Sequence, residues 1–233
     1  KEERCILLKI ISTNEDFSKI NPNIENENKL VIDQIISSTN NQNPVNQSLL
    51  YATDSIQRNL EIFFLSKGYY YDRRKDYYRN QNKPLDKIFS ITFASQAIET
   101  IYFKNPVSAR SRPTSLIKNR KDYDRIFNLK FSPESILNCC LLLRKSMSFF
   151  TKSNIDDLSN YQTYKLHTSR IVTSLLLKKD IYYSKNLEKI NLDRLDLVLF
   201  KKAFNILKKL LNEYQNIYPS ENLINIAKNN KFN

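Results

Sequence analysis

Glycine is almost missing from this chain: its 233 residues contain one, Gly68, whereas an average protein has about 7%. Loops that wrap phosphates with their backbone, such as the Walker and dinucleotide-binding loops, need several glycines within a short stretch. The sequence therefore excludes both kinds of loop. Gly68 follows Lys67 at the end of an apolar, helix-like stretch, where a left-handed residue commonly terminates a helix.

Histidine and cysteine are also too few for several kinds of site. One His and three Cys argue against a zinc centre and a His-based catalytic triad, so we expect no metal site and no cofactor in this fragment. Cys139 and Cys140 are adjacent in an apolar run, and neighbouring cysteines rarely pair with each other. We expect them and Cys5 to be buried free thiols in a reducing compartment.

Membrane and export signals are not visible. The longest apolar stretch is well short of the roughly 18 residues that a membrane-spanning helix needs, and no signal peptide is recognisable. The chain starts at Lys1 and passes almost directly into the apolar run Cys5–Ile11, which suggests a C-terminal fragment of a longer protein. We expect a cytoplasmic protein without a membrane partner.

The spacing of apolar residues predicts a mainly α fold with a small N-terminal β element (α+β) and a bundle-like C-terminal region. Strands are expected at Cys5–Ile11 and Tyr69–Tyr71. Helices are expected from Thr53-Asp54, over Leu85–Phe103, from Pro133 to about Lys152, from Asp156 to about Lys179, over Leu192–Tyr214 and over Asn222–Lys228. We divide the chain into a strand–helix–strand segment, residues 1–80, and a helical region, residues 81–233, packed on it as one unit.

Positive charge is concentrated away from the N-terminus. Residues 1–62 carry six basic and nine acidic residues, a net −3, and the total of +13 leaves +16 for the remaining 171. Residues 104–130 hold eight basic residues against Asp122 and Asp124, with tyrosines and phenylalanines interleaved. Such a pattern is typical of a surface that binds phosphates and stacks on bases. The alternative is a solvated basic face with the tyrosines packed inside.

Four segments, in this order, resemble the AIPR (abortive infection phage resistance) family. They are IISTN (Ile10–Asn14), IISSTNNQNPV (Ile35–Val45), DSIQRNLE (Asp54–Glu61) and GYYYDRRK (Gly68–Lys75). The resemblance covers residues 6–79 and continues more loosely to residue 177. It implies a bacterial anti-phage defence protein whose effector part, nuclease-like in this family, lies upstream of the present sequence.

The motif residues and the basic stretch give the candidates for nucleic-acid or anion binding: Asn40, Gln42, Asn43, Gln57, Arg58, Tyr70, Arg73, Arg74, Arg110 and Arg112. Amides suit base edges or phosphate, and guanidinium groups suit phosphate. Structural alternatives stay open: the amides cap their own loop, Arg58 pairs with Glu61 or Asp54, and Arg73 and Arg74 pair with Asp72 and Asp76. For His167, a structural role is expected.

A complete catalytic set is not recognisable. Lys75 lacks the carboxylate two residues before it that a D…E-x-K nuclease set requires, because Arg73 occupies that position. We therefore expect no catalytic residue here, and a fragment that binds DNA, RNA or a nucleotide. Two alternatives stay open. One is a helical regulatory or homo-oligomerisation module that docks through Leu192–Tyr214 and binds no nucleic acid; the other is a metal-dependent phosphodiesterase built from scattered Asp and Glu.

Overall fold

The computed structural model describes residues 51–111, 113–127, 131–152, 161–177, 186–229 and 232. All of them belong to one compact unit, residues 46–233. The unit is mainly helical and contains one two-stranded parallel sheet, which confirms the expected fold class. The predicted strand Cys5–Ile11 lies outside the described residues, and the division at residue 80 stays a prediction.

Helix α3 (Ser55–Ser66) begins at the predicted position because Asp54, in an extended conformation, accepts a hydrogen bond from the Ile56 amide. The helix ends at Gly68, whose φ of +77° lies in the left-handed region. A Cβ at this position would meet no atom within 4 Å, so the backbone conformation alone accounts for glycine. The turn leads into β1 (Tyr70–Asp72), the second predicted strand.

Strand β2 (Ile88–Ser90) was not expected. It pairs in parallel with β1, with Tyr71 opposite Phe89, and Phe89 is fully buried against Phe64. The predicted helix over Leu85–Phe103 is therefore wrong at its start: a 3-10 turn, η2 (Leu85–Lys87), and β2 precede α4 (Ile91–Ile101). The Ser90 hydroxyl accepts from the Phe93 amide and starts α4 there.

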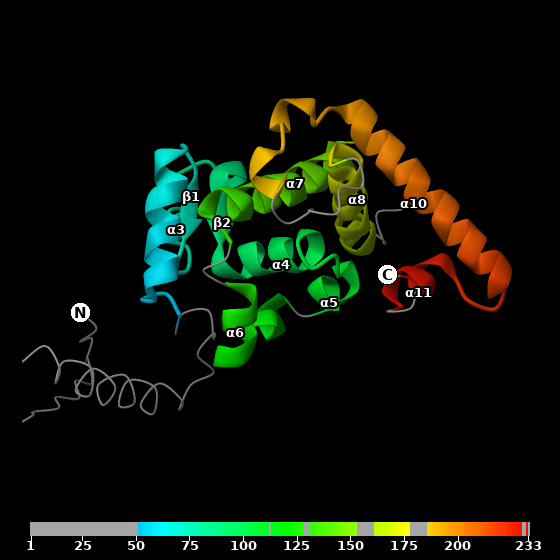
Figure 1. Ribbon diagram of the computed structural model, residues 1–233, viewed down its shortest axis with the longest axis horizontal. Helices are drawn as coiled ribbons and strands as arrows, with labels where there is room; N and C mark the ends of the chain where they lie inside the picture. Colours follow the sequence, from blue (N-terminus) through cyan, green and yellow to red (C-terminus); the bar gives the residue numbers. More distant parts are fainter. Residues whose placement is uncertain are drawn as a thin grey trace, which may run out of the picture. The chain divides into compact units, whose positions relative to one another are not determined.

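The remaining elements form the helical body (Figure 1). They are α5 (Pro106–Ser111), η3 (Pro113–Ile117), α6 (Arg120–Ile126), α7 (Pro133–Lys152), α8 (Tyr161–Leu176), η5 (Leu187–Lys189), η6 (Leu192–Arg194), α10 (Leu197–Ile217) and α11 (Leu223–Lys228). Helix α7 begins at Pro133, as predicted. Helix α10 begins later than predicted because Asp196 accepts from the Leu199 amide and caps it, while Leu192 lies in a 3-10 turn.

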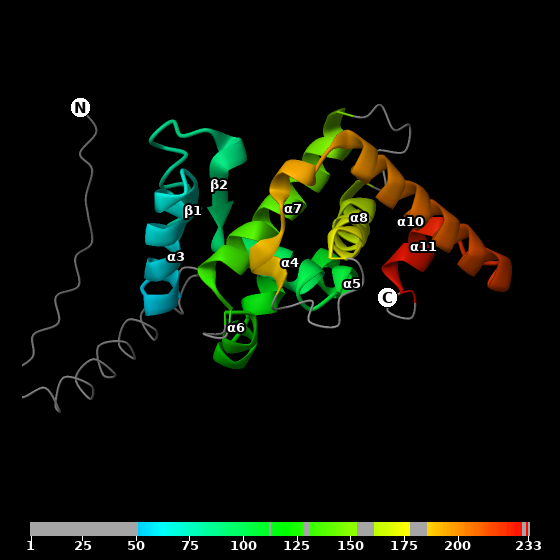
Figure 2. The same ribbon diagram turned by 45° about the horizontal axis from the view of Figure 1, so that its top comes forward.

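The core lies between α4, α7 and α8, and α10 packs along α8 (Figure 2). Cys139 and Cys140 are buried free thiols on α7, as predicted, whereas Cys5 lies outside the described residues. Burial raises the pKa of the Cys139 thiol to about 12, so it stays protonated. Helix α3 packs against β1, and α4 follows β2 and contacts it; this corner carries the two motif segments that the structure describes, Asp54–Glu61 and Gly68–Lys75.

Candidate nucleic-acid interface

Gln57 is a buried structural amide. Its side chain is fully buried; Nε2 donates to the Tyr123 hydroxyl at 3.0 Å, and Oε1 accepts from the Tyr71 hydroxyl at 2.6 Å. These two bonds connect α3 with α6 and with β1. Burial raises the pKa of both tyrosines above the usual value, so both phenols stay protonated. Gln57 is therefore not exposed for ligand contact.

Arg73 is neutralised within the fold. Its Nε lies 2.6 Å from Glu61 Oε2, and the two side chains are 15% and 16% exposed. A second guanidinium nitrogen donates to the Ala52 carbonyl oxygen, and Tyr78 donates its hydroxyl hydrogen to Glu61 Oε1 at 3.0 Å. Burial and this bond raise the pKa of Tyr78 to about 12. We call this group, Glu61, Arg73 and Tyr78, the buried clasp.

The partners suggested from the sequence for Arg73 are otherwise engaged. Asp72 is buried and accepts from the backbone amide of Tyr78 at 3.4 Å, and burial raises its pKa. Asp76 lies 3.9 Å from Arg79. The choice of Glu61 as the partner of Arg73 depends on how α3 packs beside β1, which local sequence does not reveal.

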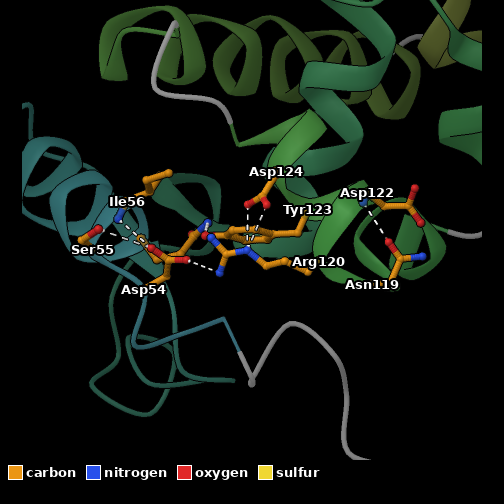
Figure 3. A network of polar contacts seen from close by, with 9 residues as sticks. Asp54, Ser55, Ile56, Asn119, Arg120, Asp122, Tyr123 and Asp124 are labelled. Carbon is orange, nitrogen blue, oxygen red and sulfur yellow. Dashed lines mark hydrogen bonds and ion pairs between the residues drawn. The ribbon is translucent and has the colours of Figure 1, made fainter. Parts of the chain in front are cut away.

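Arg120 joins α6 to the start of α3 (Figure 3). Its Nη1 lies 3.0 Å from Asp54 Oδ2, and its Nε lies 2.9 Å from Asp124 Oδ1. Its guanidinium carbon lies 5.2 Å from the centre of the Tyr123 ring, and Tyr51 stacks on Tyr123 at 4.0 Å. Arg120 thus supports the fold and contributes little free charge to the predicted basic stretch.

A row of rings with a cation at each end begins in β1 and continues into the turn after it; Arg74 and Tyr77 are its exposed members, whereas Tyr78 is buried. Arg74 lies 3.9 Å from the Tyr77 ring centre, the Tyr77 and Tyr78 rings are 5.0 Å apart, and Tyr70 and Tyr78 are 5.1 Å apart. Lys83 Nζ lies 5.4 Å from the Tyr70 ring centre. We call these five residues the aromatic–basic surface. Arg74 is exposed and Tyr77 is 36% exposed, so cation and ring are both open to a ligand.

This surface joins two of the candidate residues, Tyr70 and Arg74, with Tyr77 and Tyr78, which belong to the same Arg- and Tyr-rich stretch of the sequence, and with Lys83, which was not predicted. The segment that carries it turns sharply: Asp76 and Asn82 have φ of 60° and 56°. Neither a helical nor a strand period describes such a segment, so the sequence does not predict which of its side chains lie next to each other. Only the clustering of tyrosine with arginine signalled it.

The other predicted residues do not join this surface. Arg58 is exposed on α3, and among the described residues it pairs with neither Glu61 nor Asp54. Arg110 lies on α5, which packs against α4 and α8 away from β1 (Figures 1 and 2), and its Nε is buried without a hydrogen bond. The remaining four candidates, Asn40, Gln42, Asn43 and Arg112, lie outside the described residues.

His167 has a buried, structural position on α8, as expected. It lies 2.8 Å from the Ala227 carbonyl oxygen, and because that oxygen only accepts, Nε2 carries the hydrogen. Burial lowers the pKa of His167 to about 4, and the positive charges of Arg170 and Arg110 add to the effect. The neutral ring thus holds α11 against α8.

Metal and membrane features are not found in the described ranges. No group of three or more His, Cys, Asp or Glu among these residues is placed to hold a metal ion. None of the helices described is both long enough and apolar enough to span a bilayer.

Comparison with known proteins returns one finding. Residues 1–222 match a protein-family model described as AIPR protein, which includes all four segments singled out in the sequence. Searches of curated proteins and of solved structures returned no match.

Proposed function

Because the chain belongs to the AIPR family, which acts in bacterial abortive-infection defence against phage, we propose that it binds nucleic acid through the aromatic–basic surface. Membership in the family establishes the role in anti-phage defence, and nucleic-acid binding is the part that we propose. In this proposal the surface supplies recognition, and the effector step belongs to another part of the protein.

The observation that supports this proposal is a row of three tyrosine rings with a cation packed on the ring at each end. Bases stack on aromatic side chains with about 1–3 kcal/mol each, while Arg and Lys neutralise phosphates and release counterions. Arg74 and Lys83 each lie against a tyrosine ring. Exposed Lys75 adds a further cation in the same turn. A single strand offers both bases for the exposed ring and phosphates for the cations beside it.

The buried clasp fixes one ring of the aromatic–basic surface, Tyr78. Tyr78 contacts both Tyr70 and Tyr77 and donates its hydroxyl hydrogen to Glu61. Since Glu61 is held by Arg73, the middle ring of the row has a fixed orientation. The exposed Tyr77 packs on this fixed ring, so stacking of a base on Tyr77 loses little conformational entropy.

Fluorescence anisotropy with labelled single-stranded DNA and RNA tests the proposal. Tyr77→Ala removes a stacking ring and the support of Arg74, so we expect about a tenfold loss of affinity. Arg74→Glu should lose more and reduce the salt dependence by about one phosphate contact. Lys202→Glu, an equal charge change on an exposed residue of α10, is the matched control. Equal loss in all three variants, or no loss in any, contradicts the proposal.

Self-association through α10 is a second candidate function. Leu197 and Val198, adjacent at the start of this helix, are 53% and 72% exposed, and Ile217 at its end is 68% exposed; these apolar side chains are the observation that favours docking through α10. We expect a mass above that of the monomer in light scattering, and a return to the monomer in Val198→Asp. A monomer at every concentration contradicts this alternative.

A further inference from the structure

A groove of about 640 Å³ lies between α8 and α10, and we call it the α8–α10 groove. Ile171 and Leu175 line it from α8, and Ile206, Leu210 and Ile217 line it from α10. Residues four or seven apart lie on one face of a helix, so the groove follows both helices. From Ile206 to Ile217 it extends about 16 Å along α10. Its volume falls within the range of about 300–1,000 Å³ typical of small-molecule sites.

The lining of the groove is mostly apolar and has no net charge. Of the described residues that line it, Arg170 and Glu213 are the charged ones, one of each sign. His167 also lines it and is neutral, because burial lowers its pKa. Leu210 and Ile217 remain 44% and 68% exposed. Neither charge is in excess to select an ionic ligand, whereas removal of these apolar side chains from water favours an apolar one.

Phe232 crosses the groove at one point. Its ring centre lies 5.5 Å from that of His167 on α8 and 5.7 Å from that of Tyr214 on α10, so the ring bridges the two helices. A helix of another protein is about 10–12 Å wide with its side chains and would have to displace Phe232 to lie along the groove. A single hydrocarbon chain is much thinner and flexible, and it can pass beside the ring.

The length and the chemistry of the groove together point to one kind of ligand. We propose that the α8–α10 groove binds an unbranched aliphatic chain, carried by a free fatty acid or by a lysophospholipid. Because an extended chain gains about 1.2 Å per bond, a chain of roughly 14 carbons matches the length of the groove along α10. The chain contacts leucine and isoleucine side chains of both helices, and its polar head group stays on the solvent side.

A series of chain lengths tests the proposal. Isothermal titration calorimetry of the full 233-residue chain would use octanoate, decanoate, dodecanoate, tetradecanoate and octadecanoate, each below its micelle concentration. Every CH₂ that enters the groove should raise the affinity about fourfold, and the gain should stop near tetradecanoate. Affinity that is independent of chain length overturns the proposal. An equally steep rise from tetradecanoate to octadecanoate overturns it too, because the length of the groove would then set no limit.

The head group distinguishes the two sources of the chain. Tetradecanoate and tetradecanoyl lysophosphatidylcholine carry the same chain on different heads. Tighter binding of the first assigns the groove to a free fatty acid, and tighter binding of the second assigns it to a lysophospholipid. Equal affinities support recognition of the chain alone. Binding of neither overturns the proposal and favours an apolar helix of another protein as the occupant.

Matched leucine variants locate the site. Leu210→Glu places a carboxylate in the groove and should weaken tetradecanoate binding at least tenfold. Ile217→Glu repeats this test at the end of the groove, and circular dichroism checks the fold of each variant. Leu197→Glu is the control, because Leu197 is 53% exposed on the same helix but does not line the groove. Wild-type affinity in both groove variants, or an equal loss in Leu197→Glu, overturns the proposal.

Discussion

Arg73 and Arg74 are neighbours in one motif, yet they belong to two different environments. Arg73 lies in the buried clasp with its charge neutralised by Glu61, whereas Arg74 is exposed and lies on the Tyr77 ring. Both residues lie in the bend that follows β1, and Glu61 on α3 is placed to meet Arg73 and not Arg74. A motif that resembles a family pattern therefore mixes residues that build the fold with residues that are free to bind.

Removal of the clasp carboxylate should have the largest effect. Glu61→Ala leaves Arg73 without its counter-charge and Tyr78 without its acceptor, and breaking a largely buried pair from one side costs about 3 kcal/mol. We expect the free energy of unfolding in urea to fall by that amount. Glu213→Ala, whose exposed carboxylate lies 3.7 Å from Lys209, should change it by less than about 0.5 kcal/mol. An equal loss of stability in Glu61→Ala and Glu213→Ala would mean that the buried clasp contributes no more than an exposed ion pair.

Gln57 should have the next largest effect on stability. Gln57→Leu leaves the Tyr71 hydroxyl without its acceptor and removes the amide that donates to the Tyr123 hydroxyl, at a cost of about 2 kcal/mol. Adding Tyr71→Phe removes one of these hydroxyls and should recover part of the loss, because an apolar replacement of both partners is far less costly. Chemical denaturation of the single and double variants measures this. A double variant less stable than Gln57→Leu would contradict the hydrogen-bond account.

Tyr78 belongs to the buried clasp and also contacts the rings of the aromatic–basic surface. The pH dependence of stability tests its hydrogen bond to Glu61. Its pKa is raised to about 12 in the folded chain from 10.0, so its contribution to stability is complete below pH 10 and is lost as pH rises to 12. Tyr78→Phe should cost about 1 kcal/mol at pH 7 and show a smaller loss of stability between pH 10 and 12. Thermal unfolding over this range measures it, and identical pH profiles would count against the Tyr78–Glu61 bond.

Elements defined by local signals were predictable from the sequence. Asp54 before α3, Pro133 at the start of α7 and Gly68 after α3 each act through the adjacent backbone, so their effects are visible in a short window. Strand β2 was missed because Ile88 and Phe89 also fit a helical spacing, and only pairing with β1 decides between the two.

The residue types of the candidate site could be predicted from the sequence. Which of these side chains contact each other could not. The density of Arg and Tyr after Gly68 pointed to the segment that carries the aromatic–basic surface. Which arginine is neutralised depends on Glu61, 12 residues away from Arg73, and Arg120 meets Asp54 across 66 residues.

The neighbouring arginines give the most direct test of the central claim. Arg73→Ala and Arg74→Ala should be compared for the free energy of unfolding and for affinity to single-stranded nucleic acid in the same buffer. The account predicts that Arg73→Ala lowers stability by several kcal/mol, and that Arg74→Ala lowers affinity about tenfold while stability changes by less than about 0.5 kcal/mol. Unchanged affinity in Arg74→Ala, together with a loss of stability as large as that of Arg73→Ala, would contradict it.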